Sequence, residues 1–174
     1  SLEAGRIAVN GKPFSVRNSW EALDQDLAFI VENPADTMLF PDFTAIDNLC
    51  FPSSRKARDF WINPVYRASC LREYSQYFEP GALKRYPDEL STQDLLKLVY
   101  CRWHLFKPSV VVCVKPFSSI DRNLEDIGAF FIDLLLKKGI AVLILTSSAA
   151  EIDIGRKKIV INQKNDPLHP KNDL

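Results

Sequence analysis

The sequence predicts an α/β fold built on a parallel sheet, and three neighbouring segments carry that prediction. Residues 110–114 (VVVCV) and 141–145 (AVLIL) are uninterrupted apolar runs, typical of strands that are buried on both faces of a sheet. Between them, apolar residues recur at helical spacing from Leu124 to Leu135, and this stretch closes at Gly139. A strand, a helix of about 15 residues and a second strand form a βαβ unit, whose two strands run parallel.

The N-terminal part of the chain predicts further strands and one short helix. Residues 6–12 predict a short strand that ends in a turn, because their Asn-Gly pair favours positive backbone φ. Ser19 is the predicted N-cap of the helix that follows. Residues 27–31 form a continuous apolar run and predict a buried strand, which ends before Pro34 because proline cannot donate to a sheet ladder. A last strand is expected over residues 159–161.

The middle of the chain predicts helices instead of strands. Apolar residues recur at helical spacing from about residue 44, and several prolines divide residues 44–97 into short helices. Residues 95–106 predict a longer helix. We therefore expect a single domain over residues 3–162, with a helical subdomain at about 44–97, followed by a polar tail at 163–174.

Charge and composition argue against several classes of function. The chain has 22 basic and 22 acidic residues, so its formal net charge is zero and no basic excess favours nucleic acid or an anionic membrane. No apolar run approaches the roughly 18 residues that a membrane span needs, and we expect no signal peptide because the first residues have no charged n-region and no apolar h-region. The sequence therefore predicts a cytoplasmic protein without direct membrane insertion. Because the chain lacks an initiator Met, we expect a piece of a longer protein.

The cysteines and histidines do not predict a metal site. The four cysteines include no Cys-x-x-Cys pair, and neither histidine lies at ligand spacing with any of them. Cys101 and Cys113 lie in apolar segments, where a small buried thiol is the ordinary explanation. We therefore expect reduced thiols and no bound metal.

Residues 89–121 carry a specific sequence similarity. Leu90-Ser91 opens the segment, Arg102-Trp103 follows, and Ile120-Asp121 ends it. With these residue pairs aligned, the segment resembles the second ATPase half of bacterial ABC sugar importers of the ribose and galactose type. That half contains a helix opening with LSGGNQQK or LSGGQQQK and then a strand with LILDEPTRGID. The resemblance implies a partial P-loop NTPase fold of the ABC ATPase type, in which a parallel sheet is joined to a helical subdomain.

The resemblance extends over residues 5–161 and suggests three residues at nucleotide-binding positions. Glu32 is similar to the acidic residue of the family's Q-loop, Ser91 to the serine of its signature motif, and Asp121 to the aspartate of its D-loop. The resemblance therefore makes these three residues candidate cofactor-binding residues.

Two departures from the family concern the chemistry of ATP. The chain contains no GxxxxGK(S/T) motif, whose backbone N–H groups and lysine hold the phosphates, so ATP and Mg²⁺ would require a segment upstream of Ser1. The family's Asp-Glu pair at the end of the following strand, which positions Mg²⁺ and the attacking water, is Val114-Lys115 here. We expect Lys115 to form a salt bridge with Asp121 or Glu32 in place of the metal.

The signature loop departs from the family as well. Thr92 and Gln93 stand where the family has glycines that approach the partner's γ-phosphate, and Asp94 adds negative charge beside them. The same residues fit a helix capping box, with Ser91 as the N-cap and Asp94 at the third helical position. We favour the capping role over residual phosphate sensing.

These losses predict a pseudo-ATPase with no catalytic residue and no bound cofactor. The domain would act as a structural, regulatory or protein-interaction module. Its partner would be a second copy of the chain, another ABC ATPase half or a permease, which would bring it to the inner membrane. One alternative is the nucleotide-binding half of a sugar ABC importer whose Walker A motif lies upstream. Another is a cleft that binds a small molecule unrelated to ATP.

Overall fold

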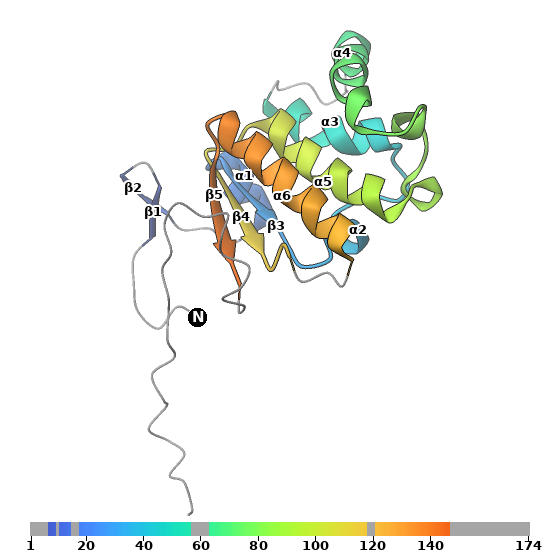
Figure 1. Ribbon diagram of the computed structural model, residues 1–174. Coiled ribbons are helices and arrows are strands. Elements are labelled where there is room, and N and C mark those ends of the chain that lie inside the picture. The colour runs from blue at the N-terminus through green and yellow to red at the C-terminus, as the bar shows by residue number, and fades with distance from the viewer. Residues whose placement is uncertain (1–6, 10, 15–17, 57–62, 118–120, 147–174) are drawn as a thin grey trace, which may run out of the picture.

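A three-stranded parallel sheet is the centre of the fold (Figure 1). The computed structural model describes residues 7–9, 11–14, 18–56, 63–117 and 121–146. Its strands are β3 (Leu27–Ile30), β4 (Val110–Val114) and β5 (Ala141–Leu145), in the order β3-β4-β5. Leu27 pairs with Val110, which pairs with Ala141, so the three strands start together. Their carboxyl ends therefore also meet at one edge, where parallel sheets commonly bind ligands.

Two long helices cover one face of the sheet. They are α5 (Thr92–Phe106) and α6 (Arg122–Lys137), and they pack against each other (Figure 1). Ala28, Ile30 and Val111 point to this face and share one core cluster with Leu98 of α5 and Leu135 of α6. The predicted βαβ unit is confirmed, because β4 and β5 run parallel and α6 connects them.

Among the described residues, the second face of the sheet is covered only in part, which corrects the prediction that residues 141–145 are a buried strand. The short helix α1 (Ser19–Asp24) lies over β3 and β4, where Ala22, Leu27 and Val112 form a smaller cluster. On β5, however, Leu143 is 49% exposed and Leu145 is 45% exposed. The apolar run predicts the strand correctly, but burial depends on what packs against its second face.

Every element described between residues 44 and 97 is helical, as the spacing of apolar residues predicts. These are α3 (Ala45–Lys56), α4 (Pro64–Tyr74), the 3₁₀ helices η1 (Ser75–Tyr77), η2 (Ala82–Lys84) and η3 (Pro87–Glu89), and the start of α5. The short helix α2 (Pro34–Thr37) precedes them and begins at the proline that ends the strand region. α3 packs against α5, whereas α4 lies at the outer edge, away from the sheet (Figure 1).

The N-terminal segment forms the predicted turn, but the helix after it is capped by a different residue from the one predicted. β1 (Ile7–Val9) and β2 (Lys12–Phe14) pair antiparallel, and Gly11 between them has a φ of 76°. The predicted cap at Ser19 is wrong, because the helix already includes Ser19. Asn18 caps it instead, since its Oδ1 accepts a hydrogen bond from the Glu21 N–H at 3.0 Å.

Some predictions fall outside the described residues. These are the strand over residues 159–161 and the polar tail over 163–174. Within the part of the chain that the structure describes, no helix is both long enough and apolar enough to cross a membrane.

Candidate functional site

An ion pair lies at the carboxyl ends of β3 and β4. β4 ends at Val114, so the next side chain is Lys115, and its Nζ lies 3.1 Å from Oε2 of Glu32, two residues after β3. The prediction that this lysine pairs with a carboxylate is thus confirmed, and the partner is Glu32. The two side chains are 43% and 42% exposed, so the ion pair contributes little to stability. Its importance lies in the position of the positive charge.

The backbone at both strand ends has an uncommon conformation. Lys115 has a φ of 47° and Asn33 has a φ of 51°, and both angles lie in the left-handed region. Asparagine tolerates this region, whereas a lysine there costs about 1 kcal/mol. A hydrogen bond from the Lys115 N–H to the Leu145 carbonyl, at 2.7 Å, holds the strained residue against the end of β5.

A small cleft of about 100 Å³ lies beside the ion pair. Asn33 borders it after β3, Lys115 after β4, and Thr92 at the start of α5. The structure therefore brings the neighbours of Glu32 and Ser91 to one site. Small-molecule sites usually measure about 300–1,000 Å³, so the described part of this cleft is too small for a nucleotide.

Ser91 caps α5, as the sequence predicts, but the capping box is only half formed. The Ser91 Oγ accepts a hydrogen bond from the Asp94 N–H at 3.1 Å. The Asp94 carboxylate does not complete the box, because it pairs with Nζ of Lys97 at 2.9 Å. Asp94 is buried, so this pairing compensates a charge that water does not reach.

Asp121 caps α6 in the same way. Its Oδ1 accepts a hydrogen bond from the Asn123 N–H at 2.9 Å. All three candidate residues therefore have partners within the chain, because Glu32 is in the ion pair while Ser91 and Asp121 cap helices. Among the described residues, no group of three or more His, Cys, Asp or Glu side chains could hold a metal ion.

A buried polar network joins α5 to Asn48 and Met38 and could not be derived from the sequence. Arg102 on α5 is 3% exposed and donates to the Asn48 carbonyl at 2.9 Å, to Asn48 Oδ1 at 2.9 Å and to the Met38 carbonyl at 2.5 Å. Burial lowers the pKa of Arg102 to about 10, so the guanidinium remains charged at neutral pH. The network fixes the segment between α2 and α3 against α5. The Arg-Trp pair marks this arginine in the sequence, but its partners lie 54 and 64 residues away.

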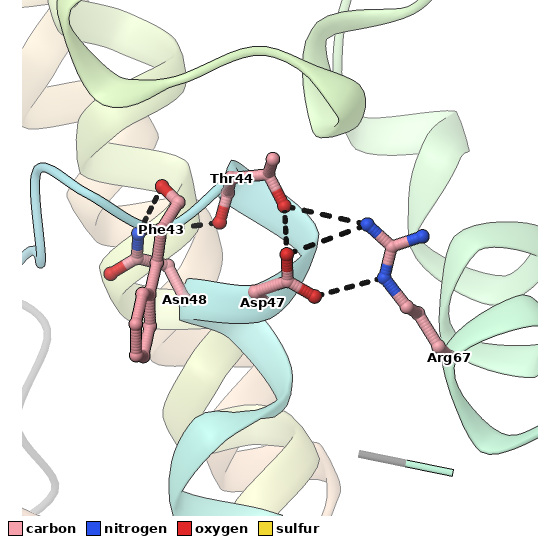
Figure 2. A network of polar contacts seen from close by, with 5 residues as sticks. All are labelled: Phe43, Thr44, Asp47, Asn48 and Arg67. Carbon is pink, nitrogen blue, oxygen red and sulfur yellow. Dashed lines mark hydrogen bonds and ion pairs between the residues drawn. The ribbon is translucent and has the colours of Figure 1, made fainter. Parts of the chain in front are cut away.

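Asn48 also belongs to a second set of contacts, which joins α3 to α4 (Figure 2). Its Nδ2 donates to the carbonyl oxygens of Phe43 and Thr44 at 3.0 and 3.3 Å. One residue earlier, Asp47 pairs with Arg67 of α4 at 2.9 Å, and the Thr44 hydroxyl donates to the same carboxylate. These contacts hold the start of α3 from both sides.

Three phenylalanines lie at the surface next to this network. Phe40, Phe43 and Phe51 have ring centroids 4.9–5.7 Å apart. Phe40 is 41% exposed and Phe43 is 37% exposed. We call these three residues the aromatic cluster. Exposed groups of aromatic side chains are typical of surfaces that bind other proteins.

Comparison with known proteins identifies the fold and its relatives. No family model matches the chain. It is 23% identical over 157 residues to the ribose import ATP-binding protein RbsA of Lactococcus lactis subsp. lactis (strain IL1403), covering 87% of this chain and 31% of that protein. It is 26% identical over 159 residues to ribose import ATP-binding protein RbsA 2 of Escherichia coli O157:H7, with coverages of 85% and 30%. The chain thus spans about a third of the length of these relatives.

Solved structures agree on the fold. The dimeric ATP-binding cassette MJ0796 bound to ADP and Pi superposes with a TM-score of 0.66 at 16% identity, covering 88% of this chain and 67% of that one. A second dimeric structure of MJ0796, a bacterial ABC transporter cassette, gives a TM-score of 0.67. The expected fold class is confirmed: the chain has part of the fold of an ABC ATPase cassette. It is an ABC ATPase-like domain related at low identity to ribose import ATP-binding proteins.

Proposed function

We propose that this chain is a non-catalytic ABC ATPase-like domain of a sugar-transporter-type ATP-binding protein, acting as a structural, regulatory or protein-interaction module. The Lys115–Glu32 ion pair carries the proposal. It places a positive charge at the strand end where the resembled family has carboxylates that serve Mg²⁺ and the attacking water.

The chemistry of phosphoryl transfer explains why this substitution matters. Catalysis depends on positioning and on stabilising negative charge, mostly through Mg²⁺ bound to phosphate oxygens. The Val114 side chain has no oxygen to offer to a metal, and the Lys115 ammonium repels one. Glu32, the nearby carboxylate, is already paired with that ammonium at 3.1 Å. The site thus uses an internal cation where the family uses a metal ion.

The start of α5 supports the same proposal. In the resembled family, glycines let the backbone N–H groups of this loop approach phosphate. Here the Asp94 N–H is occupied by Ser91 Oγ, and Asp94 brings a buried carboxylate to the same turn. An anion at this position would therefore find the Asp94 N–H already occupied, while the Asp94 carboxylate is held by Lys97.

The interaction role has separate support. The aromatic cluster exposes Phe40 and Phe43 on a segment that Arg102 and Asn48 hold rigidly. A rigid segment loses little conformational entropy on binding, which favours a docking role. The solved structures of similar fold are dimers, so a second ATPase half or a permease is a suitable partner class.

The first test is a measurement of ATP binding and hydrolysis. We expect millimolar Mg-ATP to leave the Tm of the chain unchanged and phosphate release to stay at the level of the buffer. A ligand at about 100 times its Kd would stabilise the fold by about 2.7 kcal/mol and raise Tm by at least about 5 °C. A shift of that size, or hydrolysis above the background, would contradict the proposal.

The second test restores a carboxylate at the strand end. In Lys115→Glu, the new carboxylate faces Glu32, so repulsion should lower Tm by about 1–2 °C. Millimolar Mg²⁺ should reverse this loss in the variant and leave the wild type unchanged. Lys137→Glu is the matched control, because it reverses the charge of an exposed ion pair with Asp133, on α6. An equal response to Mg²⁺ in both variants would argue against a metal position at Lys115.

A second candidate function is the nucleotide-binding half of a sugar ABC importer whose Walker A motif lies upstream. This second candidate is favoured because the chain covers only 31% of the length of the Lactococcus lactis protein. In that case a longer protein that contains a GxxxxGK(S/T) segment would show a shift in Tm with Mg-ATP, whereas we expect none for the present chain. The two candidates therefore differ in whether a segment upstream of this chain binds nucleotide.

A further inference from the structure

A cavity of about 400 Å³ lies in the helical subdomain and shares no lining residue with the cleft at the strand ends. One continuous stretch, residues 71–84, forms it, from the second half of α4 through η1 to η2. We call it the outer cavity, because α4 lies at the outer edge of the molecule (Figure 1). Its volume falls within the range of about 300–1,000 Å³ that is usual for small-molecule sites.

The buried part of the lining is apolar. Phe78 and Leu83 are 8% and 3% exposed and belong to the main core cluster, and Leu71 packs against that cluster. The turn between η1 and η2 leaves space beside them, since a Cβ added to Gly81 would meet no atom within 4 Å. The Lys84 N–H donates to the Gly81 carbonyl at 3.0 Å, which fixes this turn. An apolar group that enters the outer cavity would therefore contact the edge of the core.

The lining offers few hydrogen bonds to a ligand that is rich in hydroxyl groups. Ser75 has the only uncharged polar side chain of the lining, and its Oγ already donates to the Arg72 carbonyl at 3.4 Å. The Ala82 N–H is also occupied, because it donates to the Glu79 carbonyl at 3.0 Å. A sugar bound here would leave hydroxyl groups without partners, which is unfavourable. The inner part of the outer cavity therefore suits a hydrocarbon group.

The rim of the outer cavity carries an excess of positive charge. Arg72, Lys84 and Glu79 line it and are exposed. None of the three forms an ion pair with another described residue. Two cations and one carboxylate leave a net positive charge, which attracts an anion. The planar guanidinium of Arg72 can also donate two parallel hydrogen bonds to a carboxylate.

We propose that the outer cavity binds a small aliphatic carboxylate. The hydrocarbon chain of this ligand contacts Phe78 and Leu83, and its carboxylate pairs with Arg72 and Lys84 at the rim. The site uses neither the strand ends nor the start of α5. It therefore goes beyond the proposed function and does not depend on it.

The test titrates the ¹⁵N-labelled 174-residue chain with octanoate and follows the backbone amides by NMR. We expect saturable binding with a Kd of about 1 mM or lower, a value ordinary for a ligand of about ten non-hydrogen atoms. The shifted amides should cluster at residues 71–84. 1-Octanol and octylammonium have the same chain without the negative charge, and acetate has the charge without the chain. Each should bind at least about threefold more weakly than octanoate.

Variants at exposed positions separate the roles of charge and space. Arg72→Glu/Lys84→Glu should weaken octanoate binding about tenfold and bind octylammonium more tightly than the wild type does. Arg122→Glu is the matched control, because it reverses an exposed charge on α6, outside the outer cavity, and should bind octanoate as the wild type does. Ser75→Trp places a large side chain in the lining and should block octanoate binding while the Tm stays near that of the wild type.

Several results would overturn the proposal. One is equal affinity of the wild type for octanoate and octylammonium, and another is octanoate binding that Ser75→Trp leaves unchanged. Amide shifts centred on the exposed Leu143 and Leu145 of β5 would show general apolar adsorption instead of a site. The absence of octanoate binding at about 10 mM would also contradict it.

Discussion

Arg102→Met should lower the free energy of unfolding by about 3–5 kcal/mol. The guanidinium is 3% exposed and supplies three hydrogen bonds to carbonyl-type oxygens of Met38 and Asn48. Methionine fills a similar volume but donates nothing, so these buried oxygens would lose their partners. Because domains of this size are stable by about 5–15 kcal/mol, the loss should be visible as a lower urea midpoint.

Arg72→Met is the matched control for this measurement. Arg72 is exposed on α4, so the same change should alter stability by less than about 0.5 kcal/mol. A loss below about 1 kcal/mol in Arg102→Met would mean that water or a rearranged segment replaces the guanidinium. In that case the segment between α2 and α3 would not be held in the way described.

Asn48→Ala should cost about 2–4 kcal/mol and loosen the segment before α3. The Asn48 side chain is fully buried, accepts from the Phe40 N–H at 2.8 Å and donates to the Phe40 carbonyl at 2.9 Å. Alanine leaves both backbone groups of Phe40 without this partner. Denaturant unfolding measures the loss, and hydrogen exchange should show faster exchange at residues 38–44 than at β4.

Two further variants make this result specific. Asn123→Ala, at an exposed position of α6, should be nearly neutral. The Asn48→Ala/Arg102→Met double variant should lose less than the sum of the single losses, because the two side chains share a hydrogen bond. Additive losses would mean that the two residues act independently.

The sequence predicted the strands and long helices well because their signals are local. β4, α6 and β5 lie where apolar runs and helical spacing place them, and Gly139, with a φ of 82°, follows the end of α6. Burial of β5 was predicted wrongly because its apolar run looks like that of β4. The difference lies in α1, which covers the second face near β3 and β4 but leaves Leu143 exposed.

The candidate site was only partly predictable, for a related reason. The pairing of Lys115 with a carboxylate followed from a lysine placed directly after a buried strand, and the capping role of Ser91 followed from local spacing. By contrast, the hydrogen bonds of Arg102 connect α5 to segments that it meets only through tertiary packing. No periodicity in the sequence encodes such contacts.

The exposed side of β5 has a consequence for colloidal behaviour. Leu143 and Leu145 point to the same face of the strand and leave adjoining apolar surface in water. The chain has a formal net charge of zero and a calculated pI of about 6.7, so near neutral pH no electrostatic repulsion keeps molecules apart. Solubility should therefore pass through a minimum close to that pH and fall further in sulfate, which strengthens apolar association. Buffers on either side of the pI, with little sulfate, should keep the protein monodisperse.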